Sequence, residues 1–373
     1  MRGNEMRIMI GIFVLAIYGS LTFYLGWNLR AWLMSIQQFR WPIIYWALLF
    51  LISFGFMYGK LHPLLTPFNV LGSYWMFFFE YGLMICIVSN IIVKFTPLTT
   101  KLVGTASVGV LAMLLVIGTY LAYSPAVRHA TLTINKQGED MRVVLASDFH
   151  LGVLSGKRHL QNFVKLSNEE KPDLVLLAGD LVDDSPKRFI HTGMDEVLKE
   201  LTATYGVYGI LGNHEYYGKE IPAVKKAMAD AGVKMLLDET IFVEERFYLT
   251  GREDITNKKR MPLSELTPEK TELPWFVMNH TPDDLDEPAN LGVDVHVSGH
   301  THKGQMWPNH LLTKRIFELD YGYRLKDQMH ALVSSGFGFW GPPTRIGSRS
   351  ELWVIDIQFT NETITLGEND GIY

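Results

Sequence analysis

Leu-Val-Leu-Leu-Ala-Gly-Asp-Leu-Val-Asp, residues Leu174–Asp183, holds the clearest structural pattern in the chain. Its first five residues, Leu174–Ala178, form an apolar run with the length of a buried strand, which Gly179 ends. Asp180 therefore follows the carboxyl end of a strand, where ligands bind in an open α/β sheet, and the glycine allows close approach. Taken alone, Asp180 is better explained as the N-cap of a helix. Its assignment to a site therefore depends on similar clusters elsewhere.

The composition differs between the front and the rear of the 373-residue chain, which is long enough for two domains. Before Arg128 the sequence has seven Lys or Arg and two acidic residues. The totals of 34 and 39 leave 27 basic and 37 acidic residues behind it, a net charge of −10. This acidity argues against a nucleic-acid partner, which requires a basic surface. The single cysteine, Cys86, excludes a disulfide framework and a cysteine-based zinc site.

The front of the chain, residues 1–127, predicts a four-helix transmembrane domain. Four apolar stretches each approach the ~20 residues that cross a bilayer, and they are Ile8–Trp27, Trp41–Tyr58, Ser73–Val93 and Val103–Tyr123. Charged residues and prolines separate them, and Trp and Tyr lie near their ends, as at a membrane interface. A cleaved signal peptide is the alternative for the first stretch, but three more stretches follow. We therefore expect a multi-pass protein of the cell membrane in contact with the lipid bilayer.

The orientation of this domain is left open by the charges. One orientation places five Lys or Arg on the inside and the other places four, so the positive-inside rule does not choose. Four spans would put the amino terminus and the rear domain on the same side. Glu80 is the one carboxylate in the predicted spans, and it is either a functional acid or a residue near the headgroups.

Behind a predicted linker at residues 128–139, residues 140–373 predict an α/β domain, because strand-like and helix-like segments alternate. Strands are expected at 142–147, 174–178, 207–211, 241–250, 275–278, 293–297, 332–335 and 351–359. Helices are expected at 156–170, 192–203 and 222–231.

Polar side chains gather just behind five of these strands, and they are Asp148, His150, Asp180, Asn213, His214, His280, His300 and His302. Carboxylates, imidazoles and an amide without thiolates suit Mn, Fe or Zn. In Asp-x-His and His-x-His, extended backbone would point both side chains to the same side. A surface role explains any one of these histidines, and His159, His191, His296, His310 and His330 are left in that class.

Taken in order, the clusters resemble the signature of the calcineurin-like metallophosphoesterases, and they are Asp148-Phe149-His150, Gly179–Asp183, Gly212-Asn213-His214-Glu215, His280 and Gly299-His300-Thr301-His302. Gly299–Gln305 and Ser334–Gly338 are similar to the membrane-attached bacterial branch of that superfamily. The resemblance implies a fold of two packed mixed β-sheets flanked by helices, with two divalent metal ions at one edge.

The resemblance also implies a role for each residue. The first metal would be held by Asp148, His150, Asp180 and His302, and the second by Asp180, Asn213, His280 and His300. His214 would be the general acid or would stabilise the transition state. Asp183 and Glu215 would orient imidazoles, while Asp184 is expected to be a solvated loop acid. Of the divalent metals, Mn is the one we expect first, with Fe and Zn as alternatives.

Lys303 departs from the branch, which often has glycine after the second histidine. Its ammonium group would either contact a substrate phosphate or be exposed to solvent, and we prefer the interpretation that it is solvated.

These features predict a membrane-anchored phosphoesterase with two metals that hydrolyses a phosphate ester or pyrophosphate. Two metal ions neutralise the anionic oxygens that repel a nucleophile and stabilise the leaving oxygen. No P-loop pattern is present, which disfavours nucleotide-driven phosphoryl transfer. The resemblance to singly anchored relatives places the catalytic domain outside the cytoplasm, while the sequence leaves the oligomeric state open.

A lipid-linked substrate is a further hypothesis, with the UDP-diacylglucosamine diphosphatase group as a relative of this kind. Phe337, Phe339 and Trp340 would contact acyl chains, or would simply pack in the core. A non-catalytic metal-binding sensor or scaffold in the membrane is the main alternative, and His214 argues against it because a structural site needs no such imidazole. A transporter with a regulatory hydrolase domain has only Glu80 in its favour.

Overall fold

The computed structural model describes residues 2–37, 41–270 and 272–360. Arg40 and the end of the predicted rear domain, residues 361–373, lie outside this range. The chain divides into two compact units. The first contains Met1–Tyr120 with Gly341–Thr344, and the second contains Leu121–Trp340 with Arg345–Tyr373.

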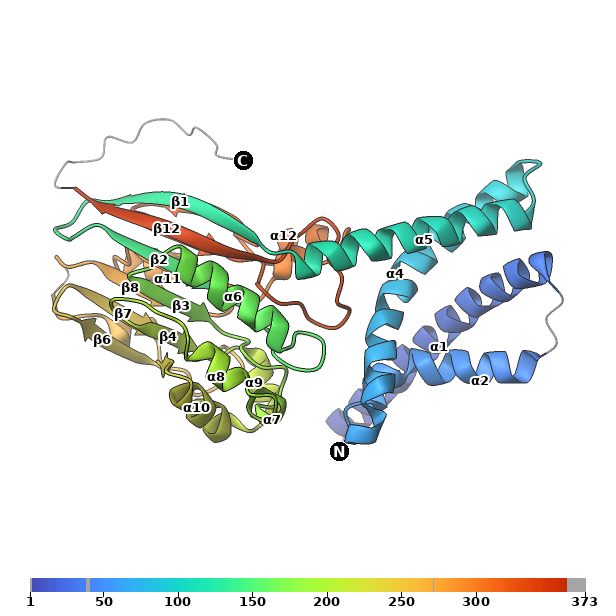
Figure 1. Cartoon of the computed structure of the whole chain (residues 1–373), viewed down its shortest axis with the longest axis horizontal. Coiled ribbons are helices and arrows are strands. Elements are labelled where there is room, and N and C mark those ends of the chain that lie inside the picture. Colours follow the sequence, from blue (N-terminus) through green and yellow to red (C-terminus); the bar gives the residue numbers. More distant parts are fainter. Residues whose placement is uncertain (1, 38–40, 271, 361–373) are drawn as a thin grey trace. The chain divides into compact units, whose positions relative to one another are not determined.

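The first unit consists of helices (Figure 1), and they are α1 (Arg2–Ile36), α2 (Pro42–Ser53), α3 (Gly55–Tyr58), the 3-10 turn η1 (Pro63–Leu65), α4 (Thr66–Phe95) and α5 (Thr100–Tyr123). Among the described residues, three segments are long and apolar enough to cross a membrane, and they are Glu5–Ile36, Thr66–Phe95 and Thr100–Tyr123. They contain the first, third and fourth predicted spans. Glu80 lies half-buried in α4.

The second predicted span, Trp41–Tyr58, does not form a helix of spanning length. Helix α2 has 12 residues and ends at Ser53, and the four residues of α3 follow. The backbones of α3 and α4 approach closely at two glycines, since a Cβ at Gly55 would lie 2.2 Å from the Phe68 carbonyl oxygen and one at Gly72 would lie 2.2 Å from the Phe56 nitrogen. The structure therefore supports three helices of spanning length rather than four.

The second unit contains two six-stranded sheets. The first has the order β1-β12-β2-β3-β4-β5 and the second β10-β11-β9-β8-β7-β6. The strands of the first sheet are β1 (Ala126–Ile134), β2 (Met141–Ala146), β3 (Leu174–Ala178), β4 (Val207–Ile210), β5 (Lys234–Met235) and β12 (Glu351–Phe359). Those of the second are β6 (Glu239–Val243), β7 (Phe247–Gly251), β8 (Trp275–Met278), β9 (Val295–Ser298), β10 (Gly322–Lys326) and β11 (Met329–Val333).

Short helices connect and cover these strands, and they are α6 (Lys157–Glu169), α7 (Lys187–His191), α8 (Met194–Leu198), α9 (Asn213–Gly218), α10 (Ile221–Asp230), η2 (Leu263–Leu266), α11 (Asp286–Asn290), η3 (His302–Gly304) and α12 (His310–Ile316). The helix predicted at 192–203 is thus confined to α8.

The two sheets face each other across an apolar core to which Leu145 and Leu176 contribute from the first sheet and Leu249 and Phe276 from the second. A second cluster, which includes Phe163 of α6, lies between the outer face of the first sheet and its helices. Both sheets are mixed, since β12 pairs antiparallel with β2 and β6 with β7, while β2, β3 and β4 run parallel, as do β7, β8 and β9. The predicted fold of two packed mixed sheets flanked by helices is confirmed.

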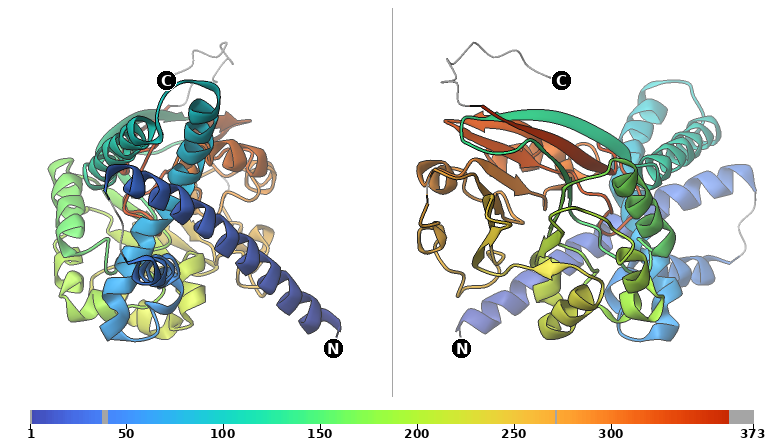
Figure 2. Two further views of the ribbon diagram at one scale, coloured as in Figure 1. Left: turned by 90° about the vertical axis from the view of Figure 1, so that its right-hand side faces the viewer. Right: turned by 60° about the vertical axis from the view of Figure 1, so that its left-hand side comes forward.

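Part of the predicted linker is a strand. Residues 126–134 form β1, which pairs in parallel with β12 along its whole length, as Figure 2 shows. Leu132 and Ile134 are buried, while Thr131 and Thr133, which alternate with them, are less so, the alternation of a half-buried strand. The linker interpretation of residues 128–134 was therefore wrong, because a strand at the edge of a sheet needs only a few apolar residues on one face.

Candidate metal centre

The carboxyl ends of parallel strands position the predicted ligands. In the first sheet, β2 leads to Asp148 and His150, β3 to Asp180, and β4 to Asn213 and His214 at the start of α9. In the second sheet, β8 leads to His280 and β9 to His300 and His302. All eight side chains are buried except that of His300, which is half-buried. Two sheet edges thus bring together residues that are far apart in the sequence.

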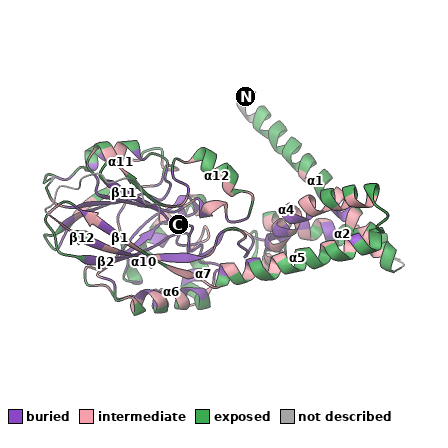
Figure 3. Ribbon diagram, turned by 90° about the horizontal axis from the view of Figure 1, so that it is seen from above, coloured by how far each residue is buried: buried purple, intermediate pink, exposed green. Residues whose placement is uncertain are grey.

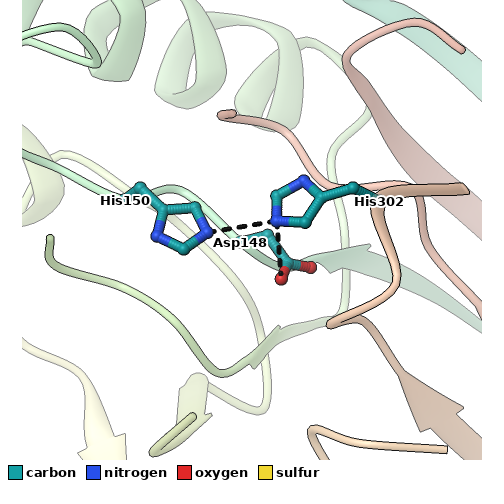
Figure 4. A group of neighbouring side chains, drawn as sticks. All are labelled: Asp148, His150 and His302. Carbon is teal, nitrogen blue, oxygen red and sulfur yellow. Dashed lines mark hydrogen bonds and ion pairs between the residues drawn. The ribbon is translucent and has the colours of Figure 1, made fainter. Parts of the chain in front are cut away.

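Three groups of described side chains could each hold a metal ion, and the first consists of Asp148, His150 and His302 (Figure 4). Nε2 of His302 lies 3.1 Å from Nε2 of His150 and 3.4 Å from Oδ1 of Asp148. The Asp148 carboxylate accepts hydrogen bonds from the backbone N–H of His300, at 3.0 Å, and from the Ser147 hydroxyl. These donors fix the carboxylate, so that its position does not depend on the two imidazoles.

The second group consists of Asp180, His280 and His300, with the Asn213 amide beside them. Oδ1 of Asn213 lies 3.2 Å from Nε2 of His280 and 2.9 Å from Nδ1 of His300. The Nδ1–H of His280 donates to the Ala178 carbonyl at 2.8 Å. This bond leaves Nε2 of His280 as the ring atom that can bind a metal.

Asp180 lies between the two groups. Its Oδ2 is 3.7 Å from Nε2 of His150 in the first group and 3.3 Å from Nε2 of His280 in the second. Its Oδ1 accepts the backbone N–H of His214 at 2.9 Å. One carboxylate is therefore within reach of both imidazole sets, which is the position that a bridging ligand requires.

Five of the predicted ligands have a left-handed backbone, with φ between 45° and 68°, and they are Asp148, His150, Asp180, His300 and His302. Each such conformation costs a non-glycine residue roughly 1–2 kcal/mol. Strain of this kind concentrates at functional sites. The i, i+2 ligands therefore meet through left-handed turns rather than on the extended backbone that the sequence analysis assumed.

Glycines let the backbone approach the carboxylates. A Cβ at Gly212 would lie 2.2 Å from Oδ1 of Asp180, and one at Gly299 would lie 2.3 Å from Oδ2 of Asp148. The glycines in the Gly-Asn-His and Gly-His-Thr-His motifs therefore provide space for the two acids.

Burial lowers the pKa of three of the imidazoles, whereas at His280 burial is outweighed by the charge of Asp180, which raises the pKa. Burial lowers the pKa of His150 to about 3 and that of His300 to about 4. Burial also lowers the pKa of His302, and the charges of His150 and Arg345 add to the effect. Neutral imidazole is the form that binds metals, so these three lowered pKa values favour ligation at neutral pH.

The two acids differ in their pKa. Burial raises the pKa of Asp148 to about 6. Burial also opposes ionisation of Asp180, but the charge and hydrogen bond of His280 outweigh it and hold the pKa of Asp180 below its usual range. Asp180 is thus the stronger acid and the better anionic ligand.

His214 lies outside the two predicted ligand sets, but with His150 and Asp183 it forms a third group whose ligand atoms could hold a metal ion. Its Nδ1–H donates to Oδ1 of Asp184 at 2.7 Å, whereas Oδ1 of Asp183 is 3.9 Å away. Burial opposes protonation of His214, but the bond to Asp184 and nearby carboxylate charges outweigh it and raise the pKa. The expectation that Asp184 is a solvated loop acid is therefore corrected, because Asp184 is in direct contact with His214. The expectation that Asp183 orients an imidazole stays a prediction.

Glu215 is fully buried, but it holds loops rather than an imidazole. Its two carboxylate oxygens accept the backbone N–H groups of Val182, at 2.9 Å, and Gly212, at 2.7 Å. Burial raises its pKa to about 8, although these two donors act in the opposite direction. Glu215 thus ties the loop after β3 to the loop after β4.

Arg345 is a residue that the sequence analysis missed. Its guanidinium is fully buried, donates to the carbonyls of Ser335 and Gly338 at 2.6 and 2.7 Å, and lies 3.2 Å from Nδ1 of His302. Its positive charge helps to keep His302 neutral. An arginine among small and aromatic residues gave no spacing signal, because it acts through the carbonyls of a loop.

The aromatic residues behind the last loop have different roles. Phe337 and Phe339 are buried and pack against His159, with ring centroids 4.7 and 5.9 Å away, whereas Trp340 is exposed. Only Trp340 therefore remains available for contact with an acyl chain.

The Lys303 ammonium lies 4.3 Å from the centroid of the Tyr321 ring, a cation–π contact.

The donor set fits divalent metals. Asp148, His150 and His302 offer ligand atoms within 4.8 Å of one another, and so do Asp180, His280 and His300. Carboxylate and neutral imidazole suit Mn, Fe or Zn. The described residues thus offer candidate ligand groups close to Asp180.

Comparisons with known proteins agree with this reading. The calcineurin-like phosphoesterase family matches residues 141–304. An uncharacterised metallophosphoesterase of Campylobacter jejuni is 28% identical over 66% of this chain and 68% of its own length. A transmembrane protein with a metallophosphoesterase domain from Danio rerio is 31% identical over 62% of this chain, which spans only 57% of that relative. A solved protein structure from Thermus thermophilus is similar at 12% sequence identity and a TM-score of 0.35. The similarity covers 54% of this chain and 92% of that protein.

Proposed function

We propose that this chain, of which residues 141–304 match the calcineurin-like phosphoesterase family, is a membrane-anchored hydrolase that cuts a phosphate ester or pyrophosphate at a two-metal centre. The observation that carries the proposal is the position of Asp180, within 3.7 Å of an imidazole of each metal set. A purely structural site would not need two sets joined by one carboxylate.

The proposed ligands follow the two groups. Asp148, His150 and His302 would hold one metal and Asn213, His280 and His300 the other, with Asp180 shared. When bound, two divalent ions, with Mn proposed first, neutralise the phosphate oxygens and stabilise the leaving oxygen.

His214 would supply the proton for the leaving oxygen. The Asp184 carboxylate accepts its Nδ1–H, which orients the ring and leaves Nε2 as the atom that faces the substrate. The raised pKa of His214 keeps it protonated closer to neutral pH than an ordinary histidine, as a general acid requires.

The apolar helices support a place in the cell membrane. Three segments of spanning length, with α2 as a fourth, shorter apolar helix, would make the protein multi-pass and hold the catalytic unit at the bilayer. A lipid-linked phosphate, of the kind cut by UDP-diacylglucosamine diphosphatases, is the proposed substrate class. We propose the extracytoplasmic side for the catalytic unit.

The test is hydrolysis by the full chain in detergent with added Mn, using bis-p-nitrophenyl phosphate and p-nitrophenyl phosphate. We expect Asp180→Asn to lose bound metal and turnover, and His214→Ala to keep the metal but lose about 10²–10⁴-fold in rate, the usual contribution of a general acid. The matched controls are Asp230→Asn and His191→Ala, which change exposed residues of α10 and α7.

The two controls should keep the activity of the wild type. Folded, metal-loaded protein that turns over neither ester would contradict the proposal and favour a metal-binding sensor. Equal activity of wild type and His214→Ala would remove the proposed proton donor but leave the metal centre standing.

A further inference from the structure

Five large apolar side chains are exposed on one border of the catalytic unit. They form what we name the apolar rim, and they are Trp307, Leu311, Leu312, Ile316 and Trp340, with 48–62% of each exposed to solvent. Three of them lie on α12, which buries none of its described residues (Figure 3). Single exposed apolar residues are normal, but a group on neighbouring segments indicates an interaction surface.

The apolar rim adjoins the metal centre. The Gln305 side chain joins the segment before α12 to Trp340, since it donates to the Trp340 carbonyl at 2.8 Å and accepts the Trp340 N–H at 2.9 Å. The Trp340 ring centroid lies 6.2 Å from that of His214. Phe317 directly follows α12, and its ring centroid lies 5.9 Å from that of His300.

The segment that carries most of the rim is positively charged, although Glu318 and Asp320 follow it and the rear of the chain is acidic. Residues 301–317 contain Lys303, Lys314 and Arg315 and no acidic residue. Lys314 and Arg315 are exposed on α12 itself. Exposed Trp, Leu and Ile combined with Lys and Arg are typical of segments that lie in the headgroup region of an anionic bilayer.

The end of an apolar helix packs on the same unit near the rim. Leu121–Tyr123, the last residues of α5, belong to the catalytic unit. The ring centroid of Tyr123 lies 5.0 Å from that of Phe339, which precedes Trp340 in the chain. The Tyr123 hydroxyl donates a hydrogen bond to the Leu154 carbonyl at 3.0 Å. The last residues of this apolar helix therefore lie beside the segment that carries Trp340.

We infer that the apolar rim, with Lys314 and Arg315, docks on the surface of an anionic lipid bilayer. Trp307, Leu312 and Ile316 enter the headgroup region, and the two cations contact lipid phosphates. The inference rests on the proposed membrane anchoring and deepens the proposed function. Docking at this border turns the metal centre towards phosphates carried by lipids rather than towards solutes.

The test uses the full chain in nanodiscs of phosphatidylcholine with phosphatidylglycerol. In a Cys86→Ser background, Leu312→Cys and Ile316→Cys each carry an environment-sensitive fluorophore, and lipids with a doxyl group act as quenchers. The matched control is Phe242→Cys, an exposed apolar position on β6, at the opposite edge of the second sheet from β10.

We expect the doxyl lipids to quench positions 312 and 316 at least about twofold more than position 242, because the rim is immersed in lipid. The double variant K314E/R315E should reduce this quenching, as should discs of phosphatidylcholine alone. Every variant should hydrolyse bis-p-nitrophenyl phosphate like wild type, since none of these residues belongs to the metal centre.

Two failures are distinguishable. Equal, weak quenching at positions 242, 312 and 316 in an active, reconstituted protein would overturn the docking and leave the hydrolase proposal intact. Chain that hydrolyses the ester but does not enter nanodiscs would overturn the membrane anchoring, and the docking with it.

Discussion

Asp184 acts on the metal centre through His214, and a single substitution tests this. Asp184→Asn keeps a side chain of the same size but removes the negative charge that orients the His214 ring and raises its pKa. We expect a loss of about 10- to 100-fold in kcat with unchanged metal content, as for other residues that position a catalytic group. Asp183→Asn, one residue earlier and 3.9 Å from the ring, is the control and should lose much less.

The pair is measured by steady-state kinetics together with metal analysis. An equal loss in both variants would mean that the acidic loop acts by charge alone, and a loss of metal in Asp184→Asn would assign it to the ligands.

His159 predicts how the stability of the catalytic unit depends on pH. It is buried, donates to the Phe337 carbonyl at 2.8 Å, and burial lowers its pKa to about 4. Between pH 6.5 and 4, His159 is protonated in the unfolded chain but neutral in the folded one. Its contribution to the free energy of unfolding is therefore complete above pH 6.5 and is lost as the pH falls towards 4. The total loss is about 3 kcal/mol.

The measurement is native-state hydrogen exchange of the β3 amides at pH 7 and pH 5. His159→Gln keeps a donor near the Phe337 carbonyl but cannot titrate, so its stability should fall by about 2 kcal/mol less than that of wild type over this range. Equal losses would show that other histidines carry the effect.

At the scale of residues, the structure brings the predicted ligands together, while their role as ligands stays a prediction, and their supporting groups were not all foreseen. Asp148, Asp180 and His280 follow strands, and position after a strand can be read from a sequence. The choice between Asp183 and Asp184 could not be predicted, because Asp184 has a left-handed backbone with φ of 66°, which turns its side chain. Arg345 lies 43 residues beyond His302 and meets it only through the folded loop.

At the scale of elements, the approach of α9 to the loop after β3 leaves no room for a methyl group. Gly212 has φ of −106°, so alanine there is not strained by its backbone, but its Cβ would meet Asp180. We expect Gly212→Ala to lower kcat about 100-fold or more, since displacement of a reacting group by 1 Å has this effect. Gly156→Ala, at the start of α6 with open space around its Cβ, is the control.

Rates and metal content of the two variants are compared under the same conditions. Wild-type kcat in Gly212→Ala would contradict the close packing of α9 against Asp180.

The elements themselves were predicted where the pattern was strong. The strands at 174–178 and 351–359 have the predicted bounds. The first is an unbroken apolar run, and the second is rich in the branched and aromatic residues that favour strands. Strand β1 was missed because its exposed half, with Arg128 and His129, is polar. The second membrane stretch was read as one helix because hydropathy does not register the break at Phe54 between α2 and α3.

At the scale of the whole molecule, the number of spanning helices decides the topology. Four spans would place the amino terminus and the catalytic unit on the same side of a membrane, whereas three spans would place them on opposite sides. We predict opposite sides, with α2 and α3 returning without crossing. Single cysteines near residue 5 and at Lys226 in a Cys86→Ser background, labelled with a membrane-impermeant maleimide in intact cells, distinguish the two.

Only one of the two positions should be labelled before the membrane is permeabilised, and both afterwards. Labelling of both in intact cells, or of neither, would restore the four-span prediction.

Strand β12 lies between β1 and β2 in the first sheet, although more than 200 residues separate it from either along the chain. During synthesis the apolar helices therefore leave the ribosome and can enter the membrane long before this sheet can close. Until residue 359 has emerged, the exposed edges of β1 and β2 have no neighbour, and partly made sheets are prone to aggregate. Tethering to a membrane would keep nascent chains apart during this interval, so the helices would serve the maturation of the enzyme as well as its location.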